Sequence, residues 1–126
     1  MLTLNTINHI RVAKFFRLDE FQCPCCHCVM LHPLLLQKLK GLRHRIAKPV
    51  IITSGYRCPS YNREAGGVKS SYHLLGMAAD IYVPKTPLAE ILKVAEEFNF
   101  KGIGFYPDQN FLHLDVRPTQ QLRWQG

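Results

Sequence analysis

The sequence predicts a single domain that mixes helices and strands, and its size and two hydrophobic periodicities support this fold class. With 126 residues, of which 47% are hydrophobic, the chain can bury one core and is too short for two ordinary domains. Two segments repeat apolar residues at helical spacing. Four shorter segments have the alternating or β-branched pattern of strands. Helices and strands are therefore expected to share one core.

Two amphipathic helices are expected, over residues 33–47 and 87–98. Pro33 stands at the start of the first helix, where the missing N–H donor of proline costs little. The apolar positions are Leu35, Leu36, Leu39, Leu42 and Ile46 in the first helix, and Leu88, Ile91, Leu92 and Ala95 in the second. The first helix should cover the sheet.

The strands are expected at residues 50–53, 77–83, 102–106 and 111–116. The first strand leads into the Ser54–Arg57 segment. The next stretch, 58–67, is rich in turn-forming residues and is expected to line a cleft. No element is assigned to residues 117–126, in which Trp124 is expected to be a packing residue rather than a platform for substrate.

Two histidines and an aspartate are placed to meet on one face of the sheet. Asp80 projects from one face of its strand, while its apolar neighbours project from the other. In the last predicted strand the apolar residues form the core face, which leaves His113 and Asp115 together on the opposite face. His73 precedes Gly76, and this glycine permits a sharp turn that brings the His73 ring back beside Asp80.

Two imidazoles and one carboxylate are the donors that a catalytic zinc ion takes when it keeps its fourth position for water. A histidine taken alone is more often a surface or core residue than a metal ligand. Here a Ser-x-His pair, a turn glycine, an in-strand aspartate and a second in-strand histidine occur together. The sequence therefore predicts that His73, Asp80 and His113 bind Zn²⁺.

Several motifs resemble those of the zinc D-Ala-D-Ala carboxypeptidase family. They are Ser54-Gly55-Tyr56-Arg57-Cys58-Pro59, then Asn62 and Gly66-Gly67, then Ser71-x-His73-x-x-Gly76-x-Ala78-x-Asp80, and finally His113-x-Asp115. The resemblance runs from about Phe21 to Trp124 and implies a compact α+β domain with an antiparallel sheet flanked by helices. It divides the single domain, 1–126, into an N-terminal extension, 1–20, and a catalytic core, 21–124.

The family consists of D-Ala-D-Ala carboxypeptidases and peptidoglycan endopeptidases. The resemblance therefore implies a zinc metallopeptidase that cleaves peptide bonds next to D-amino acids in peptidoglycan stem peptides. It does not indicate which of these bonds is cut, because the shape of the pocket sets that choice.

Carried over residue by residue, the resemblance makes His73, Asp80 and His113 the zinc ligands, and Arg57 the arginine that faces the substrate carboxylate. A guanidinium group suits that role because it binds a carboxylate through two parallel hydrogen bonds and stays charged. The alternative for Arg57 is a structural ion pair. Ser71 either orients the metal site, bonds to substrate or caps its own loop.

The general base is where the chain departs from the family. Several relatives place Asp or Glu three residues before the last histidine ligand, and here that residue is Asn110, which cannot accept a proton. Asp115 is the first candidate because it shares a strand face with His113. Its alternative role is to fix the orientation of one of the metal-binding side chains. Asp108 is the second candidate, if its loop curls over the metal.

The missing acidic group also leaves a second function open. A domain of this fold that has lost its chemistry would serve as a cell-wall-binding or scaffold module, because one fold hosts many functions. Release of new peptide products from peptidoglycan separates an enzyme from such a module.

The net charge of +7 gives a surface that attracts polyanions, and both the cell wall and nucleic acid fit this description. The basic residues are spread without interleaved aromatic residues or a recognised reading motif, so no nucleic-acid partner is expected. No segment has the length of a membrane span, and the first 17 residues lack the apolar stretch of a signal peptide. We expect a monomer that is made in the cytoplasm and acts on the cell wall after release, as a phage or prophage lysis enzyme does.

The cysteines form a cluster of their own. Cys23, Cys25, Cys26 and Cys28 lie within six residues, and Cys58 lies far from them in the sequence. Their overlapping Cys-x-x-Cys spacings form half of a structural zinc site, which would have to recruit Cys58 or a histidine. A disulfide from Cys58 to the cluster is the alternative, although a reducing cytoplasm opposes it. None of the cysteines has the acid–base neighbours of a nucleophile, so a structural role is expected.

Overall fold

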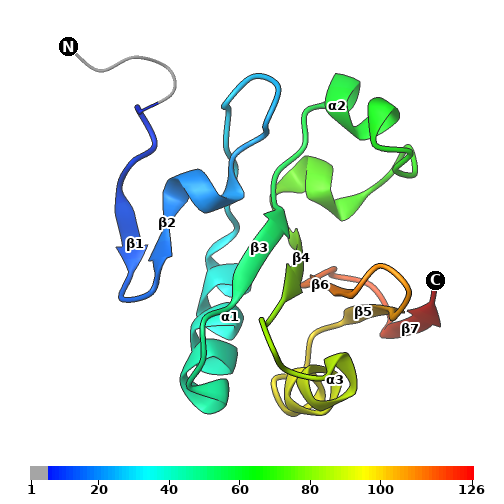
Figure 1. The fold of residues 1–126 in the computed structure, drawn as a ribbon. Coiled ribbons are helices and arrows are strands. Elements are labelled where there is room, and N and C mark those ends of the chain that lie inside the picture. Colours follow the sequence, from blue (N-terminus) through cyan, green and yellow to red (C-terminus); the bar gives the residue numbers. More distant parts are fainter. Residues whose placement is uncertain (1–5) are drawn as a thin grey trace.

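The computed structural model describes residues 6–126 and contains a five-stranded sheet (Figure 1). In spatial order its strands are β3 (Ile51–Ser54), β4 (Ala78–Tyr82), β6 (Phe111–Asp115), β5 (Gly102–Tyr106) and β7 (Leu122–Gln125). Neighbours from β3 to β5 pair antiparallel, and β7 pairs parallel with β5 at the edge. The α+β fold with an antiparallel sheet is confirmed, with one parallel strand added.

Helices α1 (Pro33–Ile46) and α3 (Leu88–Glu97) cover one face of this sheet and pack against each other (Figure 1). Their apolar stripes meet the inward residues of the strands because side chains alternate along a strand. The buried core includes Leu35, Leu39, Leu42, Ile91 and Ala95 of the helices and Ala79, Ile81, Ile103, Leu112 and Leu114 of the sheet. The opposite face of the same strands is left free for polar residues.

The two long helices begin and end within one residue of the predicted bounds. The His32 side chain accepts a hydrogen bond from the Leu34 N–H at the start of α1, and Pro33 is its first residue. The helix ends at Ile46, and Ala47 caps it with a left-handed φ of 58°. Among residues 6–126, no helix is long and apolar enough to span a membrane.

The remaining elements are short. They are β1 (Arg11–Ala13), β2 (Phe16–Arg17), the 3-10 helices η1 (Leu18–Phe21) and η2 (Tyr72–Leu75), and helix α2 (Pro59–Glu64). Phe16 and Phe21 are buried and join the hydrophobic core. The stretch 58–67, expected to consist of turns, contains α2. Residues 1–5 of the predicted N-terminal extension lie outside the described residues.

Candidate metal centre and its cleft

Two adjacent strands and one turn bring His73, Asp80 and His113 together. Asp80 of β4 and His113 of β6 are direct partners across the antiparallel ladder, so their side chains leave the sheet side by side. Asp80 Oδ1 lies 3.1 Å from His113 Nδ1 and 3.2 Å from His73 Nε2. One donor atom from each residue lies within 4.8 Å of the other two. The three predicted ligands therefore share one small site.

The position of His73 is fixed by the turn that carries it. Ser71 caps η2, because its hydroxyl accepts a hydrogen bond from the His73 N–H at 3.2 Å. Gly76 ends η2 with a left-handed φ of 68°, which only glycine adopts readily. The Nδ1–H of His73 donates to the Gly55 carbonyl at 2.7 Å, and this bond leaves the Nε2 lone pair free for a metal.

His113 is held from behind by a buried ion pair. Its Nε2–H donates to Asp115 Oδ2 at 2.8 Å, while Nδ1 faces Asp80. Arg117 donates to both oxygens of Asp115, from Nε at 2.8 Å and from Nη2 at 2.7 Å. Asp115 is 0% exposed. The Asp115–Arg117 ion pair therefore orients the His113 imidazole so that its Nδ1 points into the site.

These contacts shift the pKa values of the acidic groups downward. Burial raises the pKa of Asp115, but hydrogen bonds from Arg117 and His113 outweigh it and hold the pKa well below its ordinary range. Burial also raises the pKa of Asp80, and hydrogen bonds from His113 and His73 bring it below its usual value. Burial lowers the pKa of His113, but bonds to Asp115 and Asp80 reverse this and raise it overall.

Arg57 lies beside the metal centre, with each part of its guanidinium group in contact with a side chain. Nε donates to Ser54 Oγ at 2.9 Å, Nη1 to Asn62 Oδ1 at 3.2 Å and Nη2 to Asp80 Oδ2 at 3.2 Å. The ion pair with Asp80 fits the structural alternative for Arg57. The residue also lines the cleft next to Gly67, so one positive charge stands at the cleft wall.

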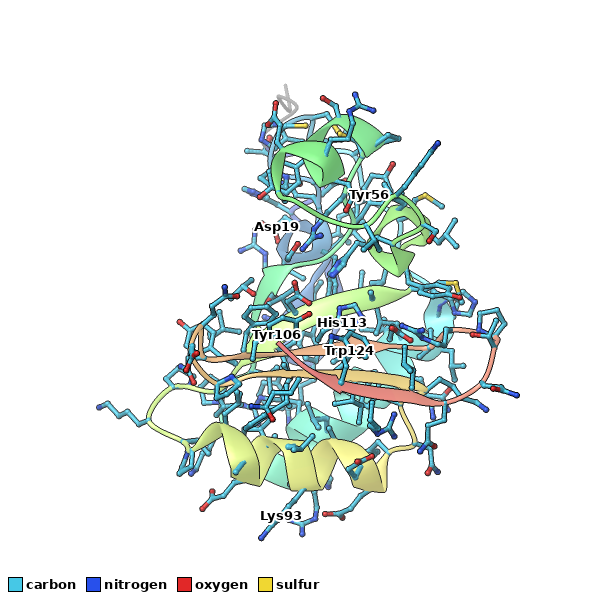
Figure 2. The ribbon with its side chains drawn as sticks, turned by 90° about the vertical axis from the view of Figure 1, so that its right-hand side faces the viewer. Asp19, Tyr56, Lys93, Tyr106, His113 and Trp124 are labelled. Carbon is cyan, nitrogen blue, oxygen red and sulfur yellow. The ribbon has the colours of Figure 1, made fainter. Side chains whose placement is uncertain are left out.

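The three residues open onto a cleft of about 560 Å³. Its aromatic wall contains Trp124 of β7, whose indole N–H donates to the Tyr106 hydroxyl at 2.8 Å. The Trp124 ring lies 5.1 Å from the His113 ring, and Tyr106 stacks on Phe111 at 4.4 Å. Figure 2 shows Tyr106, His113 and Trp124 together on the side of the sheet away from α3. Trp124 therefore packs against a predicted ligand and lines the cleft as well.

The two predicted bases are placed differently. Asp115 lies behind His113, with both carboxylate oxygens already bonded. Asp108 is exposed in the turn 107–110, in which Gln109 rather than Asp108 lines the cleft. Among the described residues that line the cleft, Asp80 is the only carboxylate. Asn110 has a left-handed φ of 56° at the end of this turn.

Arg117 is the cleft residue that the sequence reasoning missed. Its guanidinium carbon lies 4.7 Å from the centre of the Tyr72 ring and 5.5 Å from that of Trp124. The signal was present, because His113, Asp115 and Arg117 alternate along the chain and so share one face. Tyr72 adjoins His73 in the sequence and was not singled out.

The chain resembles known proteins over most of its length. Residues 11–115 match the family model described as Peptidase M15. The peptidoglycan L,D-endopeptidase MepK of Escherichia coli strain K12 is 39% identical over 90 residues, which are 68% of this chain and 47% of that protein. The probable peptidoglycan L,D-endopeptidase MepK of Haemophilus influenzae is 33% identical over 104 residues, which are 76% of this chain and 55% of that protein.

A more distant relative carries zinc in its name. The zinc D-Ala-D-Ala carboxypeptidase of Streptomyces albus G is 30% identical over 76 residues, which are 58% of this chain and 30% of that protein. The matches to the two MepK proteins span about half the length of those relatives. Because the family model matches most of the chain, a range that includes His73, Asp80 and His113, this protein belongs to the peptidase M15 family.

Proposed function

We propose that this protein is a zinc-dependent peptidase that hydrolyses peptide bonds next to D-amino acids in the stem peptides of peptidoglycan. The observation that carries the proposal is the convergence of His73 Nε2, His113 Nδ1 and an Asp80 oxygen at the edge of a cleft. Three protein donors and an open side are the arrangement of catalytic zinc sites. The names of the relatives, peptidoglycan L,D-endopeptidase and zinc D-Ala-D-Ala carboxypeptidase, support the substrate class.

The side chains present fit zinc in their chemistry as well as their spacing. Both histidines have their second ring nitrogen occupied, by the Gly55 carbonyl for His73 and by Asp115 for His113. Such outer partners fix the tautomer of a ligating histidine and direct the other nitrogen at the metal. Zinc bound there would supply a Lewis acid that polarises the scissile carbonyl and makes water acidic.

Arg57 is proposed to bind an anionic group of the substrate. Its guanidinium lies 3.2 Å from Asp80 and borders the cleft, so it places a fixed positive charge beside the reacting bond. Only one of the Asp80 oxygens contacts Arg57, and the other faces the two histidines. Arg57 is therefore suited to orient Asp80 and to attract a substrate carboxylate. Ser71 is proposed to hold His73 by capping its turn.

Asp115 is proposed to position His113 rather than to act as the base. A general base must come within hydrogen-bond reach of the proton that it removes, and the Asp115 oxygens face Arg117 and His113 instead. Asp108 remains the candidate base, one residue from Gln109 at the cleft edge. In that role, the exposed turn 107–110 must bring its carboxylate over the metal centre.

The experiment is a digest of purified peptidoglycan and of defined muropeptides, followed by mass spectrometry of the products. We expect new peptide termini or free D-Ala, loss of all products after chelation, and recovery when Zn²⁺ is restored. The masses identify whether a terminal D-Ala is released or an internal bond is cut. The matched control is His73→Ala, which should release nothing.

A second candidate function is a binding module that has lost its chemistry. It is favoured by the cleft itself, which has no carboxylate other than Asp80 among its described lining residues. A module of this kind retains sacculi in a pull-down assay and leaves their composition unchanged, with or without zinc. Zinc-dependent products would exclude it, and their complete absence in the presence of bound zinc would exclude the peptidase.

A further inference from the structure

Four cysteines from two distant segments meet at the side of the molecule that carries α2. Cys23, Cys25 and Cys26 come from the loop after η1, and Cys58 is the residue that caps α2. All four sulfur atoms lie within 4.8 Å of one another. Thiols that lie more than thirty residues apart in the sequence therefore converge on one point.

The spacing of the sulfur atoms suits a tetrahedral metal ion. With Zn–S bonds of about 2.3 Å, the four sulfurs of such a site lie roughly 3.8 Å apart. Here Cys25 Sγ lies 3.5 Å from Cys23 Sγ and 3.3 Å from Cys58 Sγ. A disulfide requires an S–S distance of about 2.05 Å and joins only two sulfurs. It would not explain why the other two sulfurs lie at the same point.

The backbone around the cluster is arranged for a thiolate. The Cys23 N–H donates to the Cys28 carbonyl and the His27 N–H donates to the Cys23 carbonyl, each at 2.8 Å, which closes a tight turn around Cys23. At the other segment, the Tyr61 N–H donates to Cys58 Sγ at 3.4 Å, so a backbone donor faces one sulfur of the cluster. Backbone N–H groups that face sulfur stabilise the anionic form that binds metal.

We propose that Cys23, Cys25, Cys26 and Cys58 bind a second, structural zinc ion. Its four thiolates complete the coordination shell, so this ion has no open position for substrate and no part in the chemistry. Cys28, which lies outside the group of four, has no role in binding it. The proposal does not depend on the peptidase activity, because no residue of the cysteine cluster belongs to the cleft.

The ion would tie the loop 22–28 to the segment that forms one wall of the cleft. Cys58 follows Arg57 directly, and the helix that it caps leads to Gly67 at the cleft edge. The Tyr56 N–H already donates to the Phe21 carbonyl at 2.8 Å, beside the start of the same loop. A metal link adjacent to this hydrogen bond would add a second connection between the two segments.

The test counts zinc per chain in protein purified under reducing conditions. We expect two ions in the wild type, one in Cys25→Ser/Cys58→Ser, and two in the matched control Cys28→Ser. The variant His73→Ala/His113→Ala should keep one ion, since it loses only the cleft site. An ion in this last variant supports the cysteine site even if the proposed peptidase fails.

Cobalt gives a second measurement that identifies the ligands. In the His73→Ala/His113→Ala background, added Co²⁺ should produce sulfur-to-cobalt charge-transfer absorption in the near ultraviolet. The absorption should vanish when Cys25 and Cys58 are serine and persist when Cys28 is serine. Its absence with all five cysteines intact and reduced would overturn the proposal.

Two other outcomes would also overturn it. One is an equal zinc count in the wild type and in Cys25→Ser/Cys58→Ser. The other is a mass lower by two hydrogen atoms in protein that was purified under reducing conditions, together with a Cys25–Cys58 peptide, which would identify a disulfide. If the double cysteine variant does not fold, the wild type still provides a test. A mercurial reagent should release one zinc ion as the cysteine thiols react, and release of none rejects the site.

Discussion

Asp115 links the candidate metal centre to the positive charge of Arg117 behind it. Its carboxylate accepts from the His113 ring and from the Arg117 side chain and backbone N–H, all within 3.1 Å. Charge-assisted bonds of this kind are the strong ones, and an unpaired buried carboxylate would be costly. The residue therefore holds His113 in the one tautomer that presents Nδ1 to the site.

We predict that Asp115→Asn lowers zinc affinity by roughly 10–100-fold, the usual cost of losing an outer partner of a ligating histidine. Competition with a chelator of known affinity measures the change. A general base would behave differently, because its loss would stop hydrolysis and leave zinc affinity intact. Asp108→Asn is the matched control: its zinc affinity should equal that of the wild type.

The metal-free protein should have a pH-dependent free energy of unfolding with two limbs. Asp115 has a lowered folded pKa, so its contribution is complete above its unfolded pKa of about 3.9 and is lost as the pH falls through the folded value. His113 has a raised folded pKa, so its contribution is complete below its unfolded pKa of about 6.5 and is lost as the pH rises through the folded value.

Urea unfolding in the presence of a chelator, over a range of roughly pH 2 to 9, measures the alkaline limb and the onset of the acid limb. The free energy of unfolding should be highest between about pH 4 and 6.5, where both contributions are complete. The variant His113→Gln should lose the decline on the alkaline side and keep part of the decline in acid. An unchanged alkaline limb in this variant would mean that His113 is not the group responsible.

Individual residues of the site were predictable where strand alternation fixes their direction. Asp80 and His113 project to one face because Ile81 and Leu112 must project to the other, and a period of two is visible in the sequence. The partners of Asp115 and Arg57 were not predictable in this way. Which oxygen faces which nitrogen depends on rotamers and on packing across elements, which the sequence does not show.

At the scale of elements, β5 is shaped by the residues that it supports. Gly102 is the ladder partner of Asp115, and Gly104 is the partner of both His113 and Trp124. A methyl group at Gly102 would strike the Asp115 carboxylate, and one at Gly104 would lie 2.6 Å from the Trp124 indole. The strand therefore carries glycines on its cleft face because two other strands place large side chains over it.

We predict that Gly102→Ala and Gly104→Ala each cost roughly 1–3 kcal/mol of unfolding free energy but have different local effects. The first should disturb Asp115 and so weaken zinc binding. The second should displace Trp124, the only tryptophan in the chain, and change its fluorescence. Each variant is the control for the other. The same fluorescence change in both would contradict the conclusion that Gly104, and not Gly102, lies under Trp124.

The long elements were predictable and the short ones were not. α1 and α3 bury apolar stripes that repeat over several turns, so their periodicity is clear in the sequence. α2 has six residues next to two glycines and reads as a series of turns. β7 is placed by its parallel pairing with β5, a long-range contact that no local pattern in residues 117–126 indicates.

At the scale of the molecule, the two faces of one sheet have different roles: one packs on the hydrophobic core and the other lines the cleft. Its lower face, as drawn in Figure 2, packs on α1 and α3, and its upper face carries the metal centre and the aromatic wall of the cleft. Polar groups gather on the upper face without interrupting the apolar core. His73, Asp80 and His113 place their donor atoms within 4.8 Å of one another there, so a metal ion bound between them would stabilise the folded state.

This arrangement predicts that zinc stabilises the whole protein by mass action. A ligand that binds only the folded state at a free concentration of 100 times its Kd raises the free energy of unfolding by about 2.7 kcal/mol. Urea unfolding of the wild type with and without Zn²⁺ measures this gain, and His73→Ala should lack it because the cleft then has two ligands. Any ion held by the cysteines contributes equally to both proteins and cancels in the comparison. Equal stabilisation of the wild type and the variant would show that zinc does not bind at His73.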